Sequence, residues 1–229
     1  MSVESLEAHK EELLPSVKIA GFDLDGTLVD SSEQIQNCLQ RTCLELLGLD
    51  IQSDLVFKNL GQPLEKILSK LNLNEKVISE VVTNFRINLQ KDILKGNRVF
   101  PGALKAIESL VNKNYKIAVA TSKPSFLAQS VVENSSLSGL ISYVQGTDNF
   151  PPKPNTEVLF RLEKKLNGKL LVMFGDRAED MQAAKTFGVL AIGVANSAHS
   201  MSDLIRAGAD YAFDSFDQLH KSSIIESTL

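Results

Sequence analysis

The spacing of hydrophobic and polar positions changes character along the chain and divides it into three parts. An apolar run at 17–21 is typical of a buried strand and leads directly into acidic residues. From 31 to 98 the apolar positions repeat with helical spacing, and after 99 short apolar runs alternate with helical segments. Alternating strands and helices favour parallel strand pairing with right-handed crossovers. The pattern therefore predicts an α/β protein with a Rossmann-like parallel sheet.

The middle part predicts three helices and no strand. Gly48 is a plausible C-cap of the first helix, Pro63 precedes the second, and the third ends before Gly96. The apolar stripes of these helices are Ile35, Cys38, Leu39, Thr42, Cys43, Leu46 and Leu47; Leu64, Ile67, Leu68 and Leu71; and Ile78, Val81, Val82, Phe85 and Leu89. A helical block of this length exceeds what a crossover between parallel strands requires. We therefore expect an inserted helical cap at 31–98 and an α/β core at 1–30 and 99–229.

The last part contains the remaining strands of the expected sheet. We predict them at 116–122, 141–145, 170–174, 190–194 and 211–213. A helix with Ala103, Ile107, Leu110 and Val111 on one face precedes the first of these strands, and a helix at about 125–133 follows it. A third helix, with Asn155 or Thr156 as its N-cap, precedes the strand at 170–174, and a fourth follows that strand.

Composition and charge exclude several function classes. The 229 residues are 43% hydrophobic and 23% charged, which is ordinary for a soluble globular protein. A net charge of −4 argues against nucleic-acid binding. No apolar run approaches the roughly 20 residues that span a bilayer, and the glutamate-rich first 16 residues do not resemble a signal peptide. Cys38 and Cys43 are expected to be reduced packing residues, so we expect a cytoplasmic protein, either a monomer or a homodimer.

Two carboxylates stand at the end of the first strand. Asp23 and Asp25 are one residue apart, so an extended backbone places both on the same face. Paired carboxylates repel each other and lose hydration, and such a pair requires a cation or a proton. The alternative is a loop with two solvated acids and a turn glycine, Gly26. Because ligands collect at the carboxyl ends of parallel strands, this position favours chemistry.

Three further strand ends carry polar groups. Thr121 and Ser122 could present a hydroxyl and backbone N–H groups to a phosphate oxygen, although such residues also cap helices widely. Lys153 lies between prolines that restrict its backbone, so its ammonium could neutralise phosphate charge. Asp176 and Asp180, about one helical turn apart after the strand at 170–174, have the oxygen ligands that Mg²⁺ prefers. Helix N-termini also favour acidic residues, which explains one carboxylate better than two.

These segments together resemble the haloacid dehalogenase-like hydrolase superfamily. Its four motifs occur here in the family order as Asp23-Leu24-Asp25-Gly26-Thr27-Leu28, Thr121, Lys153 and Gly175-Asp176 with Asp180. The helical insertion lies where the helical-cap subgroup has it. The phosphoglycolate-phosphatase-like proteins are the most similar subgroup, because Gly61-Gln62-Pro63 and Thr121-Ser122-Lys123-Pro124 resemble their segments. The sequence departs from that subgroup after Lys153, at Phe187-Gly188-Val189 and at 194–199.

The resemblance implies a Mg²⁺-dependent phosphatase that acts on a small phosphorylated metabolite. It implies that Asp23 is the nucleophile, that Asp25 is the general acid and base, and that Lys153 bridges phosphate and nucleophile. Thr121 and the Ser122 N–H would hold the phosphate. Asp23, the Asp25 backbone carbonyl and Asp176 would bind Mg²⁺, with Asp180 in support. Gln62, in the cap, is a candidate for substrate specificity.

Several alternatives share parts of this arrangement. A phosphomutase of the β-phosphoglucomutase type uses the same core residues, and so do nucleotidases and pyrophosphatases of the superfamily. A dehalogenase does not use an acid at the position of Asp25, and a phosphonatase has a small residue there. Receiver domains also combine acidic Mg²⁺ ligands with a Thr or Ser and a Lys, but they have no helical cap. A relative that only binds its ligand is a further alternative that fold analogy leaves open, although every expected catalytic side chain is present here.

Overall fold

The fold is a six-stranded parallel sheet flanked by helices, seen here in a computed structural model that describes residues 17–51, 64–195 and 199–228. The strands are β1 (Val17–Phe22), β2 (Tyr115–Ala120), β3 (Tyr143–Gln145), β4 (Gly168–Gly175), β5 (Leu190–Val194) and β6 (Tyr211–Phe213). Their order in the sheet is β3-β2-β1-β4-β5-β6, and every neighbouring pair is parallel. The predicted parallel α/β core is therefore confirmed, with strand bounds that agree with those expected to within two residues.

Helices cover both faces of the sheet. One face is covered by α6 (Ala103–Asn112), α7 (Ser125–Glu133), α11 (Phe216–Lys221) and α12 (Ile224–Thr228). The other is covered by α8 (Glu157–Leu166), α9 (Ala178–Phe187) and α10 (Met201–Arg206). Successive strand residues alternate between the two cores: Phe22 packs in the first and Ile19 in the second. Both faces are buried, as all-parallel sheets require.

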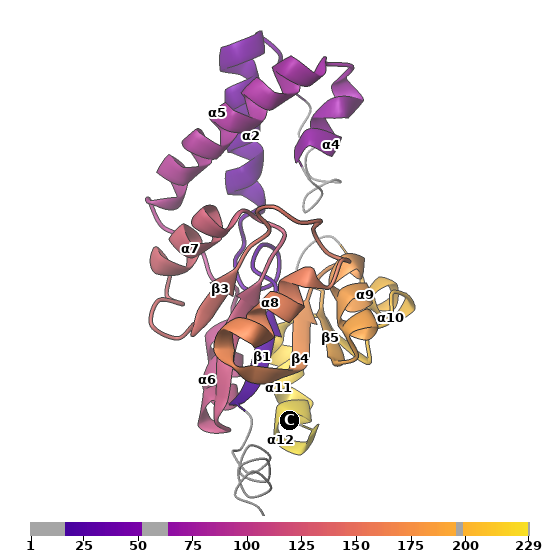
Figure 1. The fold of residues 1–229 in the computed structure, drawn as a ribbon. Helices are drawn as coiled ribbons and strands as arrows, with labels where there is room; N and C mark the ends of the chain where they lie inside the picture. The colour runs from indigo at the N-terminus through magenta and orange to yellow at the C-terminus, as the bar shows by residue number, and fades with distance from the viewer. Residues whose placement is uncertain (1–16, 52–63, 196–198, 229) are drawn as a thin grey trace, which may run out of the picture.

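The remaining helices are inserted between β1 and β2. They are α2 (Ser32–Leu47), α4 (Leu64–Leu68), the 3₁₀ turn η1 (Ser69–Leu71) and α5 (Glu75–Ile93). Figure 1 shows α2, α4 and α5 together at one end of the molecule, beyond the sheet, with α12 at the opposite end. No strand interrupts the described part of this insertion, as predicted. Its buried side chains are continuous with the core on one face of the sheet. The domain boundaries at 30 and 99 remain a prediction.

Local sequence explains where α2 ends, but it did not predict which apolar side chains are covered. Gly48 ends α2 in the left-handed conformation with φ 64°; its N–H donates to the Leu44 carbonyl over 3.0 Å, and the Leu49 N–H donates to the Cys43 carbonyl over 3.4 Å. Two residues expected in apolar stripes are instead exposed, Leu46 at 38% and Val111 at 44%. Leu46 lies in the last turn of α2, and Val111 lies at the edge of the buried face of α6. The interpretation of these two residues as buried was therefore wrong.

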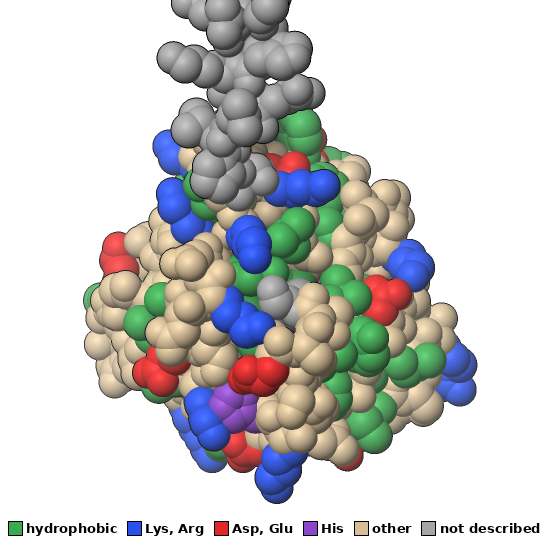
Figure 2. Space-filling model, turned by 90° about the horizontal axis from the view of Figure 1, so that it is seen from below, with side chains coloured by type: hydrophobic (Ala, Val, Ile, Leu, Met, Phe, Trp, Pro, Cys, Tyr) green, Lys and Arg blue, Asp and Glu red, His purple; other side chains and the backbone are tan. Residues whose placement is uncertain are grey.

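The outer surface shows no dominant charge on the side remote from the inserted helices. Figure 2 shows lysines, arginines and acidic residues interspersed with apolar side chains on that face. Cys38 and Cys43 are free and buried, as expected of packing residues. Among the described residues, none of the helices combines the length and apolar character needed to cross a bilayer.

Candidate active site

The site forms where the carboxyl ends of three neighbouring strands meet. β1 lies between β2 and β4, so Asp23, Thr121 and Asp176, which follow these strands, come together. The chain moves outward from β1 in one direction through β2 and in the other through β4. Parallel sheets bind ligands at such a switch point. The Asp23 N–H donates to the Phe174 carbonyl over 2.8 Å, which ties the start of the acidic loop to β4.

Two stacked aromatic rings fix the relative position of β1 and β4 directly beneath the acids. Phe22 and Phe174 are paired in register, with ring centroids 4.4 Å apart and planes 7° apart. Both rings are fully buried, and Phe216 packs beside them. Aromatic pairs of this kind contribute about 0.5–1.5 kcal/mol beyond their buried area. Because Asp23 follows Phe22 directly and Asp176 follows Phe174 by two residues, the stack positions both carboxylates.

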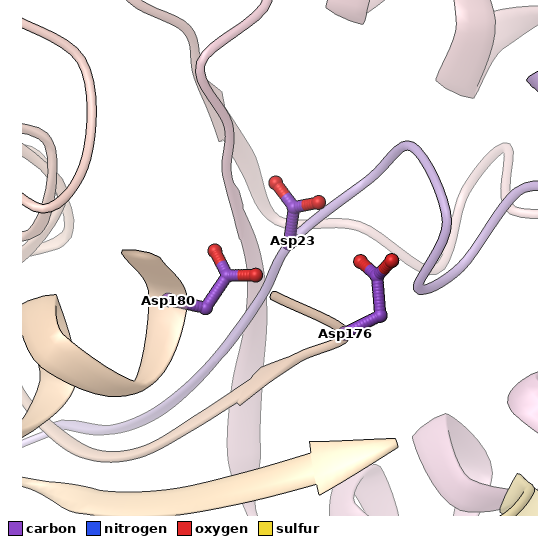
Figure 3. A group of neighbouring side chains, drawn as sticks. All are labelled: Asp23, Asp176 and Asp180. Atoms are coloured by element: carbon purple, nitrogen blue, oxygen red, sulfur yellow. The ribbon is translucent and has the colours of Figure 1, made fainter. Parts of the chain in front are cut away.

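Three carboxylates converge above these strand ends. Asp23, Asp176 and Asp180 each offer one oxygen, and these oxygens all lie within 4.8 Å of one another. Figure 3 shows them on the loop after β1, at the end of β4 and on α9, with their oxygens on the same side. Thr27 Oγ1 donates to Asp176 Oδ1 over 2.8 Å, and the Arg177 N–H donates to Asp180 Oδ2 over 3.1 Å. All three acids are buried.

Lys153 is the cation within this group. Its Nζ lies 2.6 Å from Asp23 Oδ1 and 2.5 Å from Asp180 Oδ1, and it also donates to the Ala120 carbonyl over 2.8 Å. The side chain is only 3% exposed. A buried ammonium is costly unless it is paired and hydrogen-bonded, and this one has three acceptors. The sequence-based expectation of a placed ammonium thus agrees with the geometry.

Burial and charge shift the acid–base properties of the group. The pKa of Asp23 is raised from 3.8 to about 7: burial is the largest cause, Lys153 opposes the rise, and the Asp180 and Asp176 carboxylates add to it. Burial lowers the pKa of Lys153, but Asp180 and Asp23 together raise it well above its ordinary range. Lys153 therefore stays charged.

Asp25 has its own set of partners. Ser31 Oγ donates to Asp25 Oδ1 over 2.6 Å, and Lys123 Nζ lies 3.0 Å from Oδ1 and 2.8 Å from Oδ2. The Lys123 side chain is 7% exposed, whereas that of Asp25 is 21% exposed. Sequence reasoning assigned no role to Lys123 or Ser31. The signal for Lys123 was its place two residues after Thr121, in the same strand-end loop.

The predicted phosphate-binding loop follows β2, which lies on the opposite side of β1 from β4. Thr121 is buried, its N–H donates to the Gln145 carbonyl over 3.0 Å, and its Oγ1 accepts from the Lys123 N–H over 3.2 Å. Thr147 Oγ1 donates to the Thr121 carbonyl over 3.1 Å, so the loop after β3 braces this one. A cavity of about 580 Å³ lies above; Asp23, Asp25, Thr121, Ser122, Lys153 and Asp180 all line it. Gln62 lies outside the described residues.

Comparison with known proteins identifies the family. Residues 21–194 match the family described as haloacid dehalogenase-like hydrolase. A 5′-nucleotidase of Pseudomonas aeruginosa is 32% identical over 76% of this chain and 80% of its own length. A phosphoglycolate phosphatase of Aquifex aeolicus is 30% identical over 75% of this chain and 82% of its own length. The crystal structure of a predicted phosphatase from Clostridium acetobutylicum superposes with a TM-score of 0.78 at 27% identity, covering 92% of this chain and 99% of that one.

The chain belongs to the haloacid dehalogenase-like hydrolase family. The resemblance to its phosphoglycolate-phosphatase-like members is confirmed, and so is the predicted enzyme class, a phosphatase of this superfamily. A group of buried carboxylates that could hold a metal ion accompanies this assignment.

Proposed function

We propose that the protein is a Mg²⁺-dependent phosphatase that hydrolyses a small phosphate monoester through an aspartyl-phosphate at Asp23. The observation that carries this proposal is the placement of Asp23 between a buried ammonium and two further carboxylates, at the floor of a cavity. A carboxylate held in this way presents an oxygen to the cavity without rotating freely. Asp25, two residues later on the same loop, supplies the acid and base that such a reaction needs.

The residues present fit a divalent cation. Asp23, Asp176 and Asp180 are buried carboxylates, and Lys153 pairs with two of them, Asp23 and Asp180. Gly26 lies directly against the Asp176 carboxylate, where a Cβ would overlap it. Because Gly26 has no side chain, the loop after β1 can approach Asp176 closely. Mg²⁺ prefers carboxylate and carbonyl oxygens with some retained water. Asp23, the Asp25 carbonyl and Asp176 would hold it, with Asp180 in support; when bound, it would offset charge on the phosphoryl oxygens.

In the first half of the reaction, an Asp23 carboxylate oxygen forms a bond to phosphorus while the ester P–O bond breaks in line. Asp25, protonated, gives its proton to the departing alcohol oxygen. Lys153 lies beside the attacking carboxylate and offsets charge on the phosphoryl group. Thr121 and the Ser122 N–H hold phosphoryl oxygens. The products of this half are the alcohol and phosphorylated Asp23.

In the second half, Asp25 is a carboxylate and takes a proton from water as the water oxygen bonds to phosphorus. The bond between phosphorus and Asp23 breaks, which releases inorganic phosphate and restores the Asp23 carboxylate. Lys123 and Ser31 donate to Asp25, which orients its carboxylate for the role of base. Over one turnover, Asp25 regains the proton that it gave to the alcohol, and the phosphoryl group leaves as inorganic phosphate.

The proposal is tested by turnover of an aryl phosphate with and without Mg²⁺. Activity should require the metal and be abolished by a chelator. Asp23→Asn should lose turnover, whereas Glu108→Gln, an exposed acid on α6, should keep it. Acid-quenched labelled substrate should leave a phosphate on wild-type protein and none on Asp23→Asn. Metal-independent activity, or wild-type turnover by Asp23→Asn, would overturn the proposal.

The alternatives differ in the molecule that accepts the phosphoryl group or in the leaving group. A nucleotidase differs only in its substrate. Because one relative is named 5′-nucleotidase, nucleoside monophosphates should be assayed alongside the other phosphate esters. A mutase must protect phosphorylated Asp23 from water until a sugar phosphate arrives. A phosphoenzyme that persists without substrate and discharges only when a hexose phosphate is added would favour the mutase; rapid discharge to inorganic phosphate favours the phosphatase.

A further inference from the structure

The cavity above Asp23 has a polar floor and an apolar roof. The floor consists of the site residues at the strand ends, including Asp25 and Lys153. The roof comes from three inserted helices, and its apolar lining residues are Ile35, Leu39, Leu64, Ile67, Phe85 and Leu89. Leu127, from α7, extends this apolar wall down to the floor. The part of the cavity beyond the site residues is therefore lined mainly by hydrocarbon.

The charged residues that line the roof side are paired with one another or exposed. Arg86 and Glu65 form an ion pair at 3.4 Å, with side chains 44% and 51% exposed. On the floor side, Arg177 before α9 and Glu179 on α9 approach to 3.6 Å, and Arg177 Nε and Glu179 Oε2 form no hydrogen bond within the described residues. Lys66 is an exposed residue of α4. Among the described lining residues of the roof, the buried ones, such as Leu39 and Phe85, are apolar.

From this division we infer that the preferred substrate is a phosphate monoester of an apolar alcohol or phenol. The inference rests on the proposed function and names its substrate class. A hydroxyl or carboxylate on the alcohol group would lose its hydration against Leu39 and Phe85 without gaining a partner there. A methylene or aromatic carbon loses nothing and gains from burial. A volume of about 580 Å³ lies within the usual range for small-molecule sites and leaves room for more than the phosphoryl group.

A homologous series of substrates tests the inference directly. Ethyl, propyl, butyl and hexyl phosphate have alcohols of nearly equal acidity, so differences in kcat/KM report how the alkyl group is bound. We expect kcat/KM to rise about three- to fourfold for each added methylene until the roof is filled. Each short ester has a polar counterpart of similar length: phosphoglycolate for ethyl phosphate and glycerol 3-phosphate for propyl phosphate. The alkyl ester of each pair should be the better substrate.

Two substitutions on one helix locate the effect. Ile35 lines the cavity from α2 and is partly buried, whereas Leu44 lies on the same helix and is 54% exposed. Ile35→Asn should lower the ratio of kcat/KM for hexyl over ethyl phosphate by about tenfold, and Leu44→Asn should leave that ratio unchanged. If Ile35→Asn does not fold, as judged by thermal unfolding, Leu64→Asn on α4 provides the same comparison.

The outcomes separate this inference from the proposed function. A flat dependence on chain length, or faster turnover of phosphoglycolate than of ethyl phosphate, overturns the apolar-alcohol inference and leaves the phosphatase proposal intact. Absence of Mg²⁺-dependent turnover for every ester, including an aryl phosphate, overturns the proposed function and this inference with it. A rise along the alkyl series that Ile35→Asn removes and Leu44→Asn retains supports both.

Discussion

Lys123 places its ammonium nitrogen 3.0 Å from one carboxylate oxygen of Asp25 and 2.8 Å from the other, although the two residues are 98 positions apart. The pair joins the loop after β2 to the loop after β1. It orients the carboxylate proposed as general acid and base, so Lys123 is a positioning residue that acts through Asp25.

Lys123→Met should lower kcat by roughly ten- to a hundredfold with a smaller effect on KM, because positioning errors act mainly on the chemical steps. Asp25→Asn should lower kcat by about 10²–10⁴-fold, as is typical for loss of a general acid or base. If Lys123 acts through Asp25, the double variant should be no slower than Asp25→Asn alone. Full additivity of the two losses in this cycle would contradict the assigned role.

Asp176, at the end of β4, and Asp180, on α9, should contribute unequally to the proposed metal site. Asp180 is bonded to Lys153 through one oxygen and to the Arg177 N–H through the other, so both of its oxygens already have donors. We expect Asp176→Asn to raise the Mg²⁺ concentration needed for half-maximal activity more than Asp180→Asn does. Titration of activity with Mg²⁺ measures this, with Glu108→Gln as control. The reverse order would show that the two roles are exchanged.

Gly26 should be far less tolerant of a side chain than another glycine with similar backbone geometry. Gly26 has φ 90° and Gly48 has φ 64°, so alanine costs about 1–2 kcal/mol of backbone strain at either site. At Gly48 an added Cβ meets nothing within 4 Å, whereas at Gly26 it would overlap the Asp176 carboxylate. Gly26→Ala should therefore lower the free energy of unfolding more than Gly48→Ala does, and it should also impair activity. Equal effects in urea unfolding would show that the overlap is relieved at no cost.

Metal-free protein should become less stable as the pH rises from about 4 to 7. The pKa of Asp23 is about 7 in the folded protein and 3.8 ordinarily, so the folded state binds a proton in this range that the unfolded state has lost. Unfolding free energy then falls with increasing pH, by at most about 4 kcal/mol for three pH units.

Urea unfolding in the presence of a chelator at pH 5 and pH 8 measures this change. Asp23→Asn cannot titrate, so the difference between wild type and Asp23→Asn isolates the contribution of Asp23 from that of other groups. Added Mg²⁺ should stabilise wild type more at pH 8 than at pH 5. A difference between the two proteins that does not vary with pH would contradict the raised pKa.

The sequence by itself determined the local structure and the chemistry-bearing positions. Apolar runs located the strands because a strand buried on both faces has no polar positions to interrupt it. Helical periodicity predicted the insertion between β1 and β2, and Gly48 marked the end of its first helix. Asp23, Thr121 and Asp176 were predicted as site residues because each directly follows a strand, and parallel strands present their ends at one edge.

The tertiary structure decided which of these groups touch. Periodicity gives the face of a helix but not the extent of the neighbour that covers it, so the exposure of Leu46 and Val111 was missed. Strand order placed β1 between β2 and β4, and this order brought Lys123 to Asp25 and Lys153 to both Asp23 and Asp180. Such contacts join loops that are far apart in sequence. Their geometry depends on how strands pair and how long side chains reach, and neither is encoded in local spacing.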